Sequence, residues 1–328
     1  MTVIDVHTHM LCREYLELLA EYGAPQYQRT VNQAGQDTIT SLDVPFFTLT
    51  EPMWDYGLRI RDMDAAGVDL AIVSLTCPNV YFGNGAISLQ AARLVNDSMA
   101  AQQAARPDRI RWLASLPWQY PDLALGELER AVAAGAVGIM VIATIADRPL
   151  TDPAFAPIWA AIDRHRLPVL VHPGPPAAAG ELGLAEFGLV PSVGFPFDTT
   201  LAFARIFFDG FLDRYPQLKL IAAHGGGALP YLAGRLDQCH AEIPAASAKT
   251  KTPPSEFMRR IWYDAVVYGA DALALCIEHA DSDERVLFGS DYPHNIGDMN
   301  GCLARVTALA PPAAERIQGK NAQRLFNL

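Results

Sequence analysis

Five polar residues stand at the ends of apolar stretches of this sequence, where a buried strand has no structural need for them. The run VIDVHTHM (3–10) carries two of them, His7 and His9. Three later apolar runs end in the same way, at His172, His224 and Asp291. Neutral imidazoles and a carboxylate are the ligand set that suits Zn²⁺ or a similar first-row ion. Because residues two apart share one face of a strand, His7 and His9 are expected to point the same way and to bind one ion.

The elements that would position these residues follow from the alternation of short apolar runs with longer helical stretches. Strands are predicted at 3–7, 68–75, 110–117, 137–143, 168–173, 218–227, 261–267 and 285–293. Helices are predicted at 55–67, 87–107, 121–135, 153–166, 199–216, 229–243 and 271–280. This pattern predicts an α/β protein with a single (β/α)8 TIM barrel domain over 1–328. An open doubly wound sheet is the alternative, but no GxGxxG follows the first strand.

Residues 11–50 interrupt this alternation between the first strand and its helix. The stretch is polar and rich in turn residues, and it is predicted to be an insertion, a small hairpin, over the C-terminal mouth of the barrel. Barrel enzymes carry their chemistry at that end. The four histidines and Asp291 are therefore expected to meet beneath the insertion.

Composition narrows the range of partners. A net charge of −11 and the lack of a basic stripe argue against nucleic acid. No apolar run of about 18 residues free of charge occurs, so no membrane partner is expected. The five cysteines are scattered without a CxxC pair, which favours a reducing, cytoplasmic location.

Four motifs carry a resemblance to a known family. DVHTH, VLVHPG, LIAAHGGGALPYLAGRLD and LFGSDYPH resemble the amidohydrolase superfamily, and 194–227 is similar to its aminocarboxymuconate-semialdehyde decarboxylase branch. The resemblance covers nearly the whole chain. It implies a (β/α)8 barrel with one divalent metal ion, Zn²⁺ first and Mn²⁺ as the alternative. The implied ligands are His7, His9, His172 and Asp291.

The resemblance also separates His224 from the ligands and implies that it is an acid/base group beside the ion. Binuclear members use a carboxylated lysine at the end of the fourth strand, whereas VGIMVIA (137–143) and the residues just after it contain none. A single-metal site is therefore expected.

Two reactions fit these residues. In a decarboxylation, His224 would manage the proton that replaces CO₂, and Asp291 could share in that transfer. In a hydrolysis or hydration, His224 would help to activate water instead. The resemblance favours a metal-dependent non-oxidative carboxy-lyase acting on a small aromatic or conjugated enol carboxylate, with the hydrolase or hydratase as the alternative. A non-catalytic barrel would have lost a ligand or His224, and none is lost.

Substrate contacts are predicted from three places. Phe46 and Phe47 stand near where dicarboxylate decarboxylases of the branch carry an arginine, which suggests an apolar, aromatic monocarboxylate. Tyr81 and Phe82 are either pocket walls or packing residues. His294, three residues after Asp291, either reaches the substrate or is a simple loop histidine.

Two charged residues complete the prediction. Arg235 matches a family position that reaches the site of a neighbouring subunit, which implies a homodimer or higher homo-oligomer; the alternative is a surface arginine. Asp5 lies two residues before His7, where it either orients a ligand or is a polar residue of the barrel floor.

Overall fold

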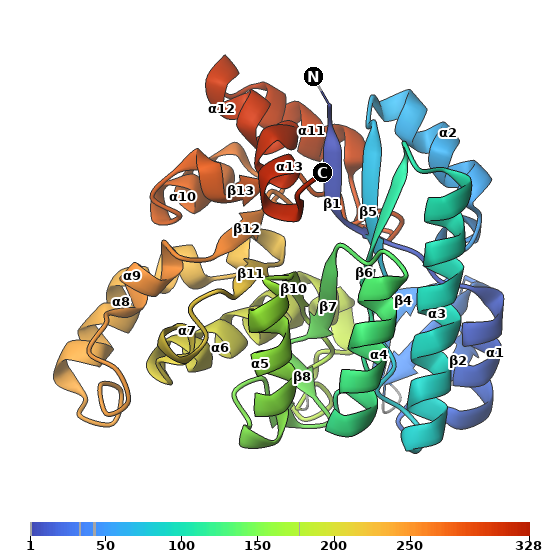
Figure 1. Cartoon of the computed structure of the whole chain (residues 1–328), viewed down its shortest axis with the longest axis horizontal. Helices are drawn as coiled ribbons and strands as arrows, with labels where there is room; N and C mark the ends of the chain where they lie inside the picture. Colours follow the sequence, from blue (N-terminus) through green and yellow to red (C-terminus); the bar gives the residue numbers. More distant parts are fainter. Residues whose placement is uncertain (1, 33, 42–43, 177) are drawn as a thin grey trace.

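The computed structural model describes residues 2–32, 34–41, 44–176 and 178–328. Eight strands form one parallel sheet in the order β1-β5-β6-β7-β10-β11-β12-β13. Their bounds are β1 (Ile4–His9), β5 (Leu70–Ser74), β6 (Ile110–Ala114), β7 (Gly138–Ile142), β10 (Pro168–His172), β11 (Lys219–Ala222), β12 (Trp262–Asp264) and β13 (Val286–Leu287). The sheet closes on itself, because the Val6 amide donates to the Phe288 carbonyl at 3.0 Å and the His9 amide to the Tyr292 carbonyl at 2.7 Å. The predicted (β/α)8 barrel is confirmed (Figure 1).

Helices surround the strands (Figure 1). The longer ones are α1 (Arg13–Tyr22), α2 (Tyr56–Ala66), α3 (Gly85–Ala105), α4 (Pro121–Ala133), α5 (Ala156–His165), α6 (Phe195–Phe208), α8 (Leu229–Glu242), α10 (Ala270–His279) and α11 (Met299–Thr307). The shorter ones are α7 (Phe211–Arg214), α9 (Pro254–Met258), α12 (Pro311–Glu315) and α13 (Asn321–Phe326). Of the helices in the described ranges, none has both the length and the apolar character needed to cross a bilayer.

The apolar strand sequences explain why the barrel forms. β7 (GIMVI) and β10 (PVLVH) are buried along their whole length, as parallel strands covered by helices on one side and a filled barrel on the other must be. Helix starts are fixed locally. The Asp55 side chain accepts hydrogen bonds from the amides of Gly57 and Leu58 at the start of α2, and Asn84 does the same for α3.

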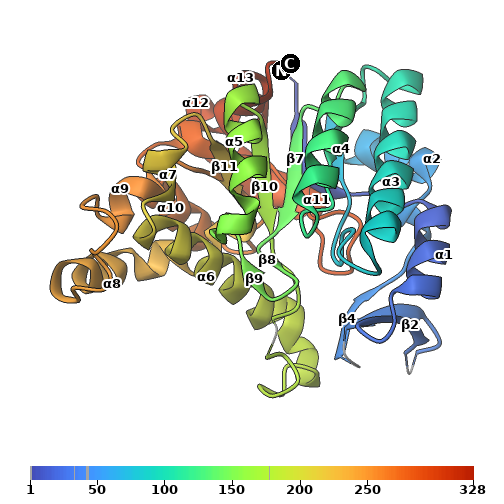
Figure 2. The same ribbon diagram turned by 60° about the horizontal axis from the view of Figure 1, so that its bottom comes forward.

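The insertion after β1 contains more structure than the predicted hairpin. It consists of α1 and a three-stranded antiparallel sheet: β2 (Tyr27–Val31), β3 (Asp37–Ser41) and β4 (Val44–Thr48). The third strand pairs Phe47 with Ile39 and buries both side chains, which the short, proline-containing run VPFFT did not indicate. Figure 2 shows this small sheet at the same end of the barrel as the hairpin of β8 (Thr144–Ile145) and β9 (Arg148–Pro149), which directly follows β7.

Candidate metal centre

The four histidines and the aspartate come together at the C-terminal ends of the barrel strands. Donor atoms of one group lie within 4.8 Å of one another and belong to His7, His172, His224 and Asp291. A second group shares the aspartate and consists of His9, Asp291 and His294. The His7 and His9 rings, two residues apart on β1, have centroids 5.0 Å apart. The strand period therefore places both imidazoles on one face, as predicted.

Two of these residues adopt left-handed backbone conformations. His224, two residues after the end of β11, has φ of 56°, and Asp291, in the loop after β13, has φ of 57°. This region is unfavourable for residues with a side chain and is concentrated at functional sites. The turns aim both side chains at one point: His224 Nε2 lies 3.5 Å from Asp291 Oδ2.

Hydrogen bonds to the outer nitrogens fix which nitrogen of each ring faces the centre. His172 Nδ1 donates to the Pro173 carbonyl at 2.8 Å, and His7 Nδ1 donates to Asp264 Oδ2 at 2.5 Å. The proton is assigned to Nδ1 because each partner can only accept. The Nε2 lone pairs of both rings are thereby directed inward, as metal-binding histidines require.

Burial sets the charges of the cluster. It lowers the pKa of His9 to about 3 and the pKa of His172 well below its ordinary value, so both imidazoles are neutral near pH 7. Burial would raise the pKa of Asp291, but hydrogen bonds from His224 and His9 hold that pKa well below its usual range. His9 and His172 therefore offer neutral nitrogens and Asp291 an ionised carboxylate, the protonation states that bind metals. Burial would also lower the pKa of His7, but the carboxylates of Asp264 and Asp291 outweigh that effect and raise this pKa instead.

Unpartnered atoms test whether a cation fits here. Nε2 of His7, Nε2 of His172 and Nδ1 of His224 are buried and make no hydrogen bond within the part of the chain that the structure describes. A buried polar atom without a partner costs about 1–3 kcal/mol. A cation between His7, His172 and Asp291 would satisfy the first two, so the residues present could hold a metal ion.

Asp264, at the end of β12, was not singled out in the sequence and is central to the site. Its Oδ2 accepts from His7 Nδ1 and, at 3.1 Å, from the backbone amide of His224. Its Oδ1 accepts from the amides of Gly225 and Val266. Burial opposes its ionisation, but the pKa of Asp264 is nevertheless lowered, chiefly by His7. The predicted strand ran from 261 to 267, so Asp264 lay inside it, whereas the observed β12 ends at Asp264. The signal that could have revealed it was a charged residue within an apolar run.

Asp5 lies beneath the cluster and links the first and last strands. It accepts from the Ser290 hydroxyl at 2.5 Å and from the amides of Ser290 and His7 at 3.2 Å. Burial raises the pKa of this carboxyl to about 6. Asp5 thus holds the backbone of His7 against the segment that leads to Asp291.

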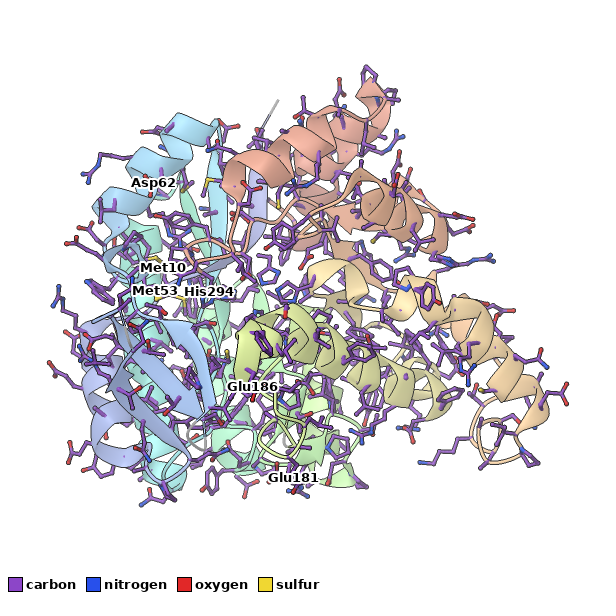
Figure 3. All side chains as sticks on the ribbon, turned by 180° about the vertical axis from the view of Figure 1, so that it is seen from behind. Met10, Met53, Asp62, Glu181, Glu186 and His294 are labelled. Atoms are coloured by element: carbon purple, nitrogen blue, oxygen red, sulfur yellow. The ribbon has the colours of Figure 1, made fainter. Side chains whose placement is uncertain are left out.

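Arg59, on α2, is a second residue that the sequence did not single out. Its side chain is fully buried, donates to Thr8 Oγ1 at 2.6 Å and to the His9 carbonyl, and lies 4.7 Å from the Tyr292 ring centroid. The Tyr292 hydroxyl donates in turn to Asp62 Oδ2, also on α2; Figure 3 labels Asp62 and, after β1, Met10. Arg59 thereby joins the end of β1 to the residue that follows Asp291.

A cavity of about 300 Å³ opens onto the cluster. It reaches His172, Asp291 and His294, and its walls include the aromatic rings of Phe46, Phe47 and Phe195. None of the described residues that line it is lysine or arginine. Concave, mostly apolar sites of this size with a few polar groups bind small organic ligands. We call it the metal-side cavity.

The residues predicted to contact the substrate do not all line the metal-side cavity. Phe47 lies in the wall of the metal-side cavity, with its ring centroid 5.6 Å from that of His294. His294 Nε2 is 2.9 Å from Thr76 Oγ1, and Figure 3 shows its place between the small sheet and the last barrel loop. Tyr81 lines a second cavity at the same end of the barrel.

Phe82 and Arg235 lie outside the metal-side cavity. Phe82 is buried, with its ring centroid 5.9 Å from that of Tyr15 on α1. Arg235 is exposed on α8 and lines neither this cavity nor the second one.

A parallel (β/α)8 barrel with a cluster of histidines and an aspartate at its C-terminal mouth is the arrangement found in metal-dependent barrel enzymes. The family model described as "Amidohydrolase" matches residues 4–328. The chain therefore belongs to the amidohydrolase family, and the resemblance seen in its motifs is confirmed.

Several proteins similar to this chain are decarboxylases. The chain is 27% identical to a 2-amino-3-carboxymuconate-6-semialdehyde decarboxylase of Dictyostelium discoideum, over 99% of this chain and 91% of the other. It is 31% identical to a gamma-resorcylate decarboxylase of Polaromonas sp., over 82% and 86%. It also superposes with a TM-score of 0.83 on the crystal structure of a dihydroxybenzoic acid decarboxylase from Polaromonas sp., with bound manganese and the inhibitor 2-nitroresorcinol. That pair is 25% identical, over 100% of this chain and 97% of the other.

Proposed function

We propose that this protein is a metal-dependent non-oxidative decarboxylase whose substrate is a small aromatic carboxylate. One observation carries the proposal: His172 and Asp291, which belong to a cluster of histidines and an aspartate, line a cavity whose walls include phenylalanine rings. The names of its relatives, which are decarboxylases of aromatic or conjugated acids, support the same reaction.

In the proposed site His7, His9, His172 and Asp291 hold one divalent ion, Zn²⁺ or alternatively Mn²⁺, which the related crystal structure contains. His7, His172 and Asp291 belong to one group of converging donor atoms, and His9 belongs to the neighbouring group that shares Asp291. When bound, the ion supplies a Lewis acid that polarises a substrate oxygen conjugated with the ring and so favours the carbanion-like transition state. Phe47 and Phe195 position the ring over the cluster and exclude water from it.

His224 supplies the proton in this proposal. The bond between ring carbon and carboxylate breaks, CO₂ leaves, and the electron pair stays on the ring carbon. The imidazolium of His224 gives its proton to that carbon, so the overall reaction consumes one proton and releases one CO₂. Asp291, whose Oδ2 lies 3.5 Å from His224 Nε2, shares in the transfer. His294, held by Thr76, contacts the substrate from the rim.

We also propose that the protein is a cytoplasmic homodimer. Apolar side chains are exposed on one stretch that runs from residue 182 through α6 to α8: Leu182, Phe187, Phe197, Leu201 and Tyr231. Phe187 is 91% exposed, and large apolar side chains exposed in this way support an interface. Arg235 lies on the same helix as Tyr231, from which it would reach the partner's site. The five cysteines are unpaired, as expected in a reducing compartment.

The decisive experiment measures CO₂ release. Metal-loaded protein is incubated with hydroxybenzoates, enol carboxylates, lactones and esters, and gas and products are assayed together. We expect one CO₂ for each aromatic carboxylate consumed. Water addition to, or cleavage of, a panel member without CO₂ would overturn the proposal in favour of a hydrolase or hydratase. Light scattering of wild type and Phe187→Asp tests the dimer, since the variant should be monomeric.

A further inference from the structure

A second cavity, larger than the first, lies at the same mouth of the barrel. Its volume is about 590 Å³, and it is lined by residues at or just after the C-terminal ends of three strands: Cys77 after β5, Ile142 in β7 and Gly174 after β10. Cys77 also lines the metal-side cavity. The two cavities are therefore neighbouring lobes of one mouth, and we call the larger one the second lobe.

The small sheet roofs both lobes. Tyr27, Ser41 and Val44 lie over the second lobe, whereas Phe46 and Phe47, two and three residues further along β4, lie over the metal-side cavity. One ligand could therefore extend from one lobe into the other beneath the same cover. The first lobe alone is within the size range of small-ligand sites, which leaves the second lobe free for a part of the ligand other than the reacting ring.

The second lobe has a different chemistry from the first. Its polar lining consists of four hydroxyl groups, the carboxamide of Gln26 and the exposed carboxylates of Asp147 and Glu181. The hydroxyls belong to Tyr27, Ser41, Tyr81 and Thr144, and Figure 3 labels Glu181. None of the described lining residues is lysine, arginine or histidine. An anion placed here would be desolvated without an opposite charge and would face two acidic groups, which is unfavourable. A neutral group that donates and accepts hydrogen bonds would be matched by the hydroxyls.

We propose that the second lobe binds a neutral, hydrogen-bonding substituent, such as an amide, on the part of the ring remote from the reacting carboxylate. The proposal rests on the proposed function, because the carboxylate is the group held at the metal cluster. It makes the physiological substrate larger than a simple hydroxybenzoate and excludes a second carboxylate at its far end.

The experiment compares four probes with 2-hydroxybenzoate as the reference. They are 4-acetamido- and 5-acetamido-2-hydroxybenzoate, 2-hydroxyterephthalate and 4-hydroxyisophthalate, each assayed for kcat/KM with the metal-loaded enzyme. One acetamido isomer should exceed the reference by at least about tenfold, equivalent to roughly 1.4 kcal/mol. Neither dicarboxylate should show a gain. A ratio near one for both acetamido compounds, or a gain for a dicarboxylate, would overturn the proposal.

Variants locate the gain in the second lobe. Ile142→Phe fills it from the barrel and Ser41→Trp from the roof, so the failure of one to fold leaves the other. In each variant, the ratio of kcat/KM for the acetamido compound to kcat/KM for 2-hydroxybenzoate should fall to about one. Val31→Trp adds the same ring to the same small sheet at a side chain that is 65% exposed, and the ratio should stay at the wild-type value. An unchanged ratio in the folded filling variants counts against the second lobe.

Binding of the corresponding phenols, which lack the carboxylate, separates this proposal from the proposed reaction. Their Kd is measured by calorimetry with wild type and the filling variants. If no probe releases CO₂, yet an acetamidophenol binds more tightly than phenol and loses that advantage on Ile142→Phe, the subsite stands and decarboxylation falls. Equal Kd values for acetamidophenol and phenol overturn the subsite whatever the reaction is.

Discussion

The residue cluster and the roof above it are built in opposite ways. His7, His9, His172 and Asp291 are each at most 4% exposed; the three histidines stand on strands of a closed barrel, and Asp291 stands in the loop after the last strand. The roof is a three-stranded sheet with one exposed face, where Val31 is 65% exposed. The barrel therefore fixes the reacting groups, whereas the insertion contacts the rest of the substrate and can vary in sequence without displacing those groups.

The largest effect is expected when the carboxylate of Asp291, which both groups of possible ligands share, is removed. Asp291→Ala should lose the metal and all measurable activity, because Asp291 belongs to both groups of possible ligands. Metal content by elemental analysis and CO₂ release check it, with apo wild type as the control. Full metal occupancy in the variant would remove Asp291 from the ligand set.

The second test separates metal binding from proton transfer within the cluster. His224→Asn should retain the metal but lower kcat by about 10²–10⁴-fold, the usual contribution of a general acid. Metal content and kcat are measured on one preparation. Near-normal turnover would show that His224 does not deliver the proton.

The third test asks whether a residue outside the cluster fixes it. Arg59→Met removes the hydrogen bonds to Thr8 and to the His9 carbonyl while keeping a side chain of similar length. We expect the free energy of unfolding to fall by about 1–3 kcal/mol. We also expect metal affinity to fall by about tenfold, the low end for residues that orient ligands. Urea unfolding of the apo protein and metal titration check these two effects. Arg61→Met, on the same helix, is the control, and an unchanged metal affinity would limit Arg59 to stability.

The smallest effect is expected in the roof. Phe47→Ala removes one ring from the wall of the metal-side cavity, so KM should rise about fivefold, or roughly 1 kcal/mol, while kcat and metal content stay close to wild type. Steady-state kinetics on the substrate found by CO₂ release check it. A loss of metal or a collapse of kcat would mean that the roof and the cluster are not independent.

The barrel and the cluster were predictable because their signals are periodic or chemically unusual. Strands buried on both faces must be apolar, so β7 and β10 were evident as uninterrupted runs, and a histidine at the end of such a run stood out. The five residues His7, His9, His172, His224 and Asp291 were found in this way, and the structure places them together. We propose their roles as ligands and acid.

What escaped prediction depends on contacts between distant segments. Arg59 looks like any solvated helix arginine in the sequence, and only the packing of α2 against β1 buries it. Asp264 lay in the middle of the predicted strand 261–267, and its hydrogen bonds to His7 and Gly225 involve residues 257 and 39 positions away. The third strand of the insertion needed the burial of Phe47 beneath the small sheet, which no local pattern records.

The position of Asp264 has a consequence for how mutations in this protein combine. A single carboxylate fixes the imidazole of His7 and the backbone of His224, so a binding group and a proposed acid share one support. The losses of activity caused by Asp264→Asn and His224→Asn should therefore sum to more than the loss in the double variant. The reason is that Asp264→Asn already displaces the imidazole that His224→Asn removes. Evolution within this scaffold is correspondingly constrained: the two functions can drift only together, and new specificity is more accessible through the insertion.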